Sequence, residues 1–148
     1  MATPRIQSES TLRLERTFTS PPAKVFAAWT SAEALSRWFA PTDDYACAVA
    51  PFEPRTGGRY RVEMRHKGGA VHPVSGRYLE VVPPSRLVFT WAWEDRPEEG
   101  EQLVTVEFQP DGAGTRLVLT HERFPNASSR DRHAEGWEGC LGRLARIV

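Results

Sequence analysis

The sequence predicts an α+β fold in which an antiparallel sheet packs against a long C-terminal helix. Segments of alternating apolar and polar residues follow one another through short turns, which favours a meandering antiparallel sheet over a βαβ arrangement. The last segment has its apolar residues at helical spacing instead, because Trp137, Cys140, Leu141, Leu144 and Val148 form one stripe. The first third of the chain also predicts a pair of short helices.

The composition fits a single domain over residues 1–148, with residues 1–10 as a polar leader. Hydrophobic residues make up 40% of the chain, enough for one core. The 19 Lys and Arg residues balance the 19 Asp and Glu residues, so we expect neither nucleic acid nor a membrane as a partner. With no secretory signal and no membrane-spanning run, we expect a cytoplasmic protein. Nearly all the basic residues are Arg, which is typical of a GC-rich bacterial genome.

The segment 20–41 predicts two short helices after the first strand. Ser20 is a good N-cap, and Pro21 at the first helical position costs no hydrogen bond. Thr30 and Glu33 form a capping box that starts a second helix, and Pro41 ends it. Helices this short need a large apolar surface to lie on.

Strand patterns occur near residues 12–18, 45–50, 59–65, 74–82, 87–93, 104–108 and 117–121. The clearest has Tyr60, Val62 and Met64 on one side and charged residues on the other, as in a sheet with one wet face. In the segment 74–82, Tyr78 and Glu80 share one phase while Leu79 and Val81 share the other. Alternation therefore leaves the inward face of that strand open.

The terminal helix is expected to begin at the caps within 126–129. A helix of about 20 residues is about 30 Å long, enough to cross a curved sheet.

Five segments in order resemble the START-like, helix-grip superfamily, and within it the family of homologues of the activator of a heat-shock-protein ATPase. The resemblance covers nearly the whole chain and implies a curved antiparallel sheet wrapped around the C-terminal helix, with a cavity between them. The segments are SPPAKVFAAWTSAEALSRWFAP (20–41), RTGGRYRVEM (55–64), GRYLEVVPPSRLVFTW (76–91), GTRLVLTHERF (114–124) and GWEGCLGRLARIV (136–148).

Aromatic side chains are the best candidates for a binding pocket, because small-molecule sites are mostly apolar. The alternative is that they only fill the core. The predicted ligand-binding residues are Trp38, Phe39, Tyr60, Tyr78, Phe89, Trp91, Trp93, His121, Trp137 and Leu141.

His121 shares the phase of Leu117 and Leu119, which places it on the inward side. It is a candidate to bind a polar group of a ligand or to act as a base. The alternative is a structural, hydrogen-bonded histidine, and Glu122 points to the other face, so no acid–histidine pair is predicted. The other three histidines are expected to be solvated.

No metal or cofactor is expected, since Cys47 and Cys140 lie far apart without metal-ligand spacing. The prediction is a binding protein for a hydrophobic or aromatic small molecule, more readily than an enzyme. Two alternatives stay open: a co-chaperone-like module that acts on a chaperone ATPase, and a cyclase- or aromatase-like enzyme that uses His121 or a tyrosine. The ligand and the formation of a homodimer also stay open.

Overall fold

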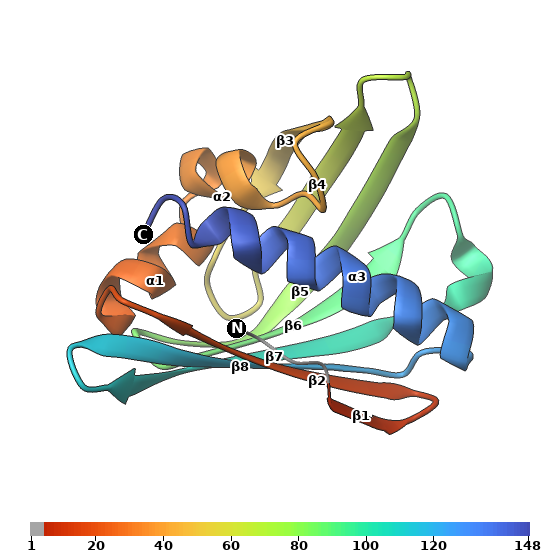
Figure 1. Cartoon of the computed structure of the whole chain (residues 1–148). Coiled ribbons are helices and arrows are strands. Elements are labelled where there is room, and N and C mark those ends of the chain that lie inside the picture. Colours follow the sequence, from red (N-terminus) through yellow and green to blue (C-terminus); the bar gives the residue numbers. More distant parts are fainter. Residues whose placement is uncertain (1–4) are drawn as a thin grey trace.

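The structure is a computed structural model that describes residues 5–148 (Figure 1). The elements follow one another in the order β1 (Arg5–Ser8), β2 (Thr11–Phe18), α1 (Pro22–Trp29), α2 (Ala32–Trp38), β3 (Tyr45–Phe52), β4 (Arg59–His66), β5 (Val71–Val82), β6 (Arg86–Trp93), the short 3₁₀ helix η1 (Pro97–Glu99), β7 (Gln102–Asp111), β8 (Gly114–Glu122) and α3 (Ala127–Leu144).

The strands form one antiparallel sheet in the order β1-β2-β8-β7-β6-β5-β4-β3. Neighbours in the sheet are also neighbours along the chain except at β2, which pairs with β8. Helices α1 and α2 therefore carry the chain from β2 to the opposite edge, where β3 lies beside β4. Helix α3 crosses the concave face of the sheet, as Figure 1 shows. This arrangement confirms the predicted α+β helix-grip fold.

Helix α1 starts one residue later than the sequence predicts. Its N-cap is Pro21, in an extended conformation, and Pro22 is the first helical residue. A residue before proline is disfavoured in the helical region, so Pro22 keeps Pro21 extended. The prediction that Ser20 caps this helix is therefore wrong, and the Ser20 carbonyl instead accepts a hydrogen bond from Thr115 Oγ1 at 2.8 Å.

Helix α2 also has a different cap from the predicted one. The side chain of Ser31 accepts from the backbone N–H of Ala34 at 3.2 Å. The Thr30 hydroxyl instead donates to the Phe26 carbonyl at 3.1 Å, in the last turn of α1. Both residues are good caps, and the tight connection between the helices decides which one is used.

A β-bulge in β5 decides which way Tyr78 faces. Tyr78 pairs with Phe89 while Glu80 pairs with Val88, so β5 carries one extra residue at this point. Tyr78 is 5% exposed and Leu79 is 46% exposed. Beyond the bulge, the partly buried Val81 packs against the core. Simple alternation cannot show this change of phase.

Helix α3 begins where the sequence predicts, because Asn126 Oδ1 accepts from the backbone N–H of Ser129 at 2.8 Å. The predicted stripe faces the sheet as far as the helix extends: Trp137, Cys140, Leu141 and Leu144 are all at most 5% exposed. Val148, the last residue of the predicted stripe, lies beyond the end of α3. At the other end, the Arg143 guanidinium donates to the carbonyls of Arg37 and Thr42 at 2.8 and 2.6 Å. These bonds fix the end of α3 against α2 and the loop that follows it.

Part of the expected polar leader belongs to the sheet. Residues Arg5–Ser8 form β1, which pairs with β2, whereas residues 1–4 lie outside the described part of the chain. None of the described helices is long and apolar enough to cross a membrane.

Candidate ligand-binding site

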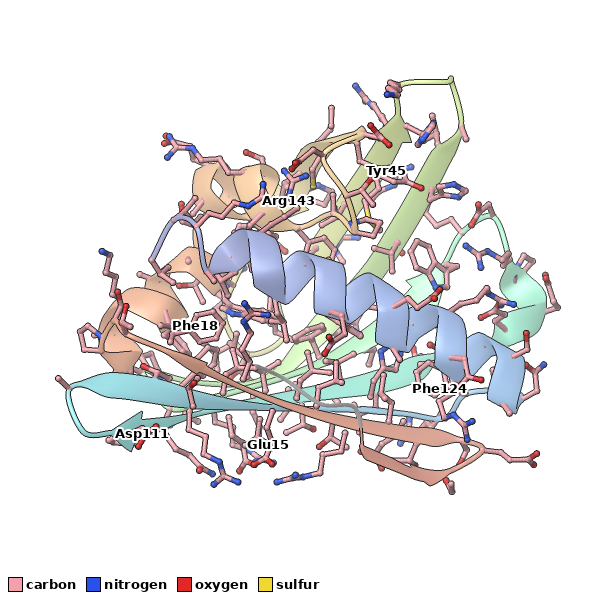
Figure 2. The ribbon with its side chains drawn as sticks, in the orientation of Figure 1. Glu15, Phe18, Tyr45, Asp111, Phe124 and Arg143 are labelled. Atoms are coloured by element: carbon pink, nitrogen blue, oxygen red, sulfur yellow. The ribbon has the colours of Figure 1, made fainter. Side chains whose placement is uncertain are left out.

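A cavity of about 450 Å³ lies between α3 and the part of the sheet formed by β3–β6. Its aromatic wall comes from three elements: Phe39 at the end of α2, Trp91 and Trp93 on β6, and Trp137 on α3. Tyr45 lies on the β3 side of this space, and Figure 2 shows its position on the far side of α3 from Phe124. Segments far apart in sequence therefore supply one apolar wall.

The rings of this wall contact one another at defined angles. The ring centroids of Trp91 and Trp93 are 5.4 Å apart, and those of Trp91 and Trp137 are 5.2 Å apart. The Phe39 ring meets that of Trp137 edge to face at 5.7 Å. Aromatic pairs of this kind contribute about 0.5–1.5 kcal/mol each beyond their burial. The wall is therefore largely preformed.

The predicted ligand-binding residues fall into three groups. Phe39, Trp91, Trp93 and Trp137 line the cavity. Tyr60, Tyr78 and Phe89 surround a much smaller space of about 20 Å³, which Phe39 also borders. Trp38, His121 and Leu141 are fully buried and line neither space.

His121 uses both of its ring nitrogens inside the protein. Its Nδ1 accepts from Trp137 Nε1 at 3.0 Å, which leaves the proton on Nε2, 2.7 Å from Gln102 Oε1. Burial, and secondarily His133, hold the pKa of His121 well below its usual range. A general base must reach the proton that it takes. In this structure His121 instead orients Trp137, a residue of the cavity wall.

His133 is the main residue of the site that sequence reasoning missed. It is expected to be solvated, but it is 6% exposed and lines the cavity. Its Nδ1–H donates to the Ser129 carbonyl at 2.7 Å, and its Nε2 accepts from Trp93 Nε1 at 2.8 Å. Burial is the main reason that its pKa is lowered. The signal was available, since His133 precedes Trp137 by four residues on the same helical stripe.

Glu99 joins the β6–β7 connection to α3. This carboxylate is 9% exposed and accepts from Ser129 Oγ at 2.7 Å and from Arg132 Nη2 at 2.8 Å, with Arg96 Nη1 at 3.5 Å. Burial alone would raise the pKa of Glu99, but the Ser129 hydrogen bond and the nearby cations outweigh it, so the pKa is lowered. The carboxylate stays ionised and holds the loop beside the cavity.

Charged side chains border the outer part of the cavity. Arg96 and Arg132 are 30% and 51% exposed, and Glu135 is also exposed. The Arg96 guanidinium lies 5.0 Å from the centre of the Trp93 ring. Among the described residues, no group of three His, Cys, Asp or Glu side chains is placed to hold a metal ion.

The family relationship follows from a match over most of the chain. Residues 19–148 match the family described as "Activator of Hsp90 ATPase homolog 1-like protein". The chain belongs to this family. The human activator of 90 kDa heat shock protein ATPase homolog 1 is 23% identical over 127 residues, which make up 86% of this chain and 33% of the human protein. The chain thus spans about a third of that relative.

Solved structures of bacterial proteins share the fold. Protein CV1439 from Chromobacterium violaceum is 32% identical, with a TM-score of 0.87 over 94% of this chain and 96% of that one. The AHSA1 protein from Silicibacter pomeroyi is 29% identical, with a TM-score of 0.80 over 93% of this chain and 96% of that one. The architecture of this chain is therefore shared with these two bacterial proteins.

Proposed function

We propose that this chain is a cytoplasmic bacterial protein that binds a hydrophobic or aromatic small molecule in the cavity between α3 and the sheet. The observation that carries the proposal is the aromatic wall of that cavity, built from Phe39, Trp91, Trp93 and Trp137. Most small-molecule sites are apolar clefts of about 300–1,000 Å³. The volume of this cavity lies in that range.

Burial of apolar surface supplies the free energy of binding in this proposal. Full burial of a group the size of a Leu or Phe side chain is worth about 1.5–3 kcal/mol. Association itself costs several kcal/mol, so the wall must be ordered in advance for this gain to appear as affinity. The bonds of Trp93 to His133 and of Trp137 to His121 provide that order.

The five tryptophans of the chain allow a direct test by nuclear magnetic resonance. Trp91, Trp93 and Trp137 line the cavity, whereas Trp29 and Trp38 do not. Naphthalene, added to the intact chain, is expected to shift the indole N–H signals of the first three more than those of the other two. Absence of any shift, or equal shifts of all five, would contradict the proposal.

Native mass spectrometry of freshly purified protein is the complementary measurement. A small molecule that stays bound through purification, and is released on unfolding, would support a carrier and identify the ligand.

A second candidate function is a co-chaperone-like module that acts on a chaperone ATPase. The descriptions of the matched family and of the human relative favour it. Pull-down and ATPase assays with the host's chaperone of the 90 kDa heat-shock class are the test. Stimulation of the ATPase would support this function, and the absence of both binding and stimulation would exclude it.

A further inference from the structure

The α3 wall of the cavity has a notch at Gly136. This glycine lines the cavity, and a Cβ atom added to it would meet no atom within 4 Å. His133 and Cys140, about one turn away on either side, also line the cavity. Between them the wall therefore drops to the helix backbone at a single residue position.

The other two glycines of α3 do not extend this notch. A Cβ atom at Gly139 would lie 2.0 Å from the carbonyl oxygen of Pro41, so the chain before β3 already fills that space. Gly142 does not line the cavity, and the nearest atom to its Cβ would be Arg16 Nη1 at 4.0 Å. The lining part of α3 between His133 and Cys140 is about 10 Å long at 1.5 Å per residue.

Two of the three indole N–H groups of the aromatic wall are already paired inside the protein, whereas Trp91 Nε1 is buried and has no hydrogen-bond partner among the described residues. Trp93 donates to His133, and Trp137 donates to His121. The Cys140 thiol remains neutral, because burial raises its pKa to about 12. An ionised ligand group at this wall would lose its hydration and meet at most the single neutral N–H of Trp91, which leaves a large free-energy cost.

The outer part of the cavity has a different character. Arg96 and Arg132 share the carboxylate of Glu99, and the exposed Glu135 adds a negative charge beside them. Water reaches these side chains. A polar substituent of a ligand can stay hydrated there while the rest of the ligand is buried.

We propose that the cavity selects an uncharged, fused-ring aromatic ligand up to about 10 Å long, and that Gly136 is the residue that admits it. The inference rests on the proposed binding function and adds the ligand class and the residue that sets the size limit. One edge of the ring system occupies the notch, and its faces pack against the indoles of the wall, as aromatic rings do with offset or edge contacts.

Two fluorescent probes with one ring skeleton test the preference for an uncharged ligand. N-phenylnaphthylamine is uncharged near neutral pH, whereas anilinonaphthalene sulfonate carries a permanent negative charge. In titrations of the intact wild-type chain, the uncharged probe is expected to bind at least about tenfold more tightly. Equal affinities, or tighter binding of the sulfonate, would overturn the selection against charge.

A pair of matched substitutions on α3 tests the role of Gly136. Gly136→Leu fills the notch and favours the helix, so the variant should fold and lose at least about tenfold in affinity for the uncharged probe. Gly136→Ala should give a smaller loss. Gly142→Leu makes the same change outside the cavity and should bind within about twofold of wild type. Thermal unfolding of all three variants checks that the fold is retained.

The outcomes separate this inference from the proposed function. Wild-type binding that Gly136→Leu leaves unchanged would overturn the role of Gly136 and keep the cavity as a binding site. Failure of both probes to bind the wild type, together with unchanged indole N–H signals, would overturn the proposed function and this inference with it.

Discussion

The two halves of α3 are held to the sheet in different ways. The first half, through Trp137, is held by directional bonds: Trp93 to His133, Trp137 to His121, and Ser129 to Glu99. The second half is held to the sheet by packing, since Leu141 and Leu144 are completely buried and Cys140 is 5% exposed. Its directional bonds, from Arg143, go to α2 and the loop that follows α2 and not to the sheet.

The cavity explains this difference. It lies against the first half of α3, where space for a ligand removes apolar contacts that would otherwise fix the helix. A hydrogen bond adds only about 0.5–1.5 kcal/mol of net stability, but it sets direction. Buried side chains pack without setting any single orientation as strictly. The first half is therefore built for precise placement of the indoles, and the second half for stability.

The largest effect is expected in the packed half. Leu141→Ala removes a completely buried side chain and should lower the free energy of unfolding by about 2–5 kcal/mol. Ile147, just beyond the helix, is 38% exposed, so Ile147→Ala should change the free energy of unfolding by only about 0.5 kcal/mol. Urea unfolding of both variants is the measurement. A small loss for Leu141→Ala would mean that the second half is loosely docked.

Acid should lower the free energy of unfolding through the two buried histidines near the first half of α3. Burial lowers the pKa values of His121 and His133 from the ordinary 6.5, so the unfolded chain takes up protons first as the pH falls. The two histidines therefore leave the free energy of unfolding unchanged above about pH 6.5 and lower it progressively below that value. Between pH 7.5 and 5.5 the loss should approach about 1.4 kcal/mol for His121, whose pKa is held well below its usual range, and should be smaller for His133, because the Ser129 carbonyl and Glu99 partly restore its pKa.

Glu99 and the arginines near His133 modify this response. Glu99 raises the pKa of His133, while Arg96 and Arg132 lower it. The pKa of Glu99 itself is lowered from 4.5, so its titration falls below the histidine range. His133→Gln should reduce the pH dependence and leave the part that is due to His121, measured by urea unfolding across this range. An unchanged dependence in the variant would contradict the assignment to buried histidines.

A loss smaller than that of Leu141→Ala is expected when the bonds between Glu99 and α3 are weakened. Glu99→Gln keeps the shape of the side chain but removes the charge that Arg132 and Arg96 share, and should cost about 1.5–3 kcal/mol. Glu98→Gln is the matched control, because the Glu98 side chain is exposed and its replacement should change the free energy of unfolding by no more than about 0.5 kcal/mol. Hydrogen exchange of residues 94–101 should rise in Glu99→Gln alone.

The smallest effects compare two glycines of the packed half. Gly142→Ala should gain about 0.5–1 kcal/mol, because alanine favours the helix and its Cβ meets no crowded neighbour. Gly139→Ala gains the same propensity but forces its Cβ against the Pro41 carbonyl, and should lose about 1 kcal/mol or more. Equal stabilisation by both substitutions, in thermal unfolding, would show that the contact with Pro41 is not tight.

Local patterns indicated most of the elements, and the resemblance to the helix-grip superfamily implied how they assemble. The alternation in the strands, the Asn126 cap and the stripe of α3 depend on neighbours along the chain, and residues close in sequence report them directly. Errors in the helix starts occurred where a neighbour competes, as when Pro22 excludes Pro21 from the helix and Ser31 replaces Thr30 as the cap. Strand β1, within the expected polar leader, was missed.

The site was only partly visible in the sequence. Phe39, Trp91, Trp93 and Trp137 were recognisable as aromatic residues on inward faces, and they line the cavity. The sequence did not show which other aromatic residues line the cavity. A side chain on the inward face of a strand can line a cavity or fill the core, and the alternation pattern is the same in both cases. Tyr78 adds a further obstacle, since a bulge changes the phase of its strand.

The sequence by itself determined most of the elements, their order and most of the apolar faces, because these follow from spacing, capping and turn chemistry within short segments. Only the tertiary structure decided that His121 and His133 are paired with tryptophans, that Glu99 is buried against α3, and that Gly136 faces open space while Gly139 meets Pro41. The physical reason is that hydrogen bonds, burial and empty volume at these positions depend on groups brought together from distant parts of the chain, whose distances exist only after the sheet has closed around the helix.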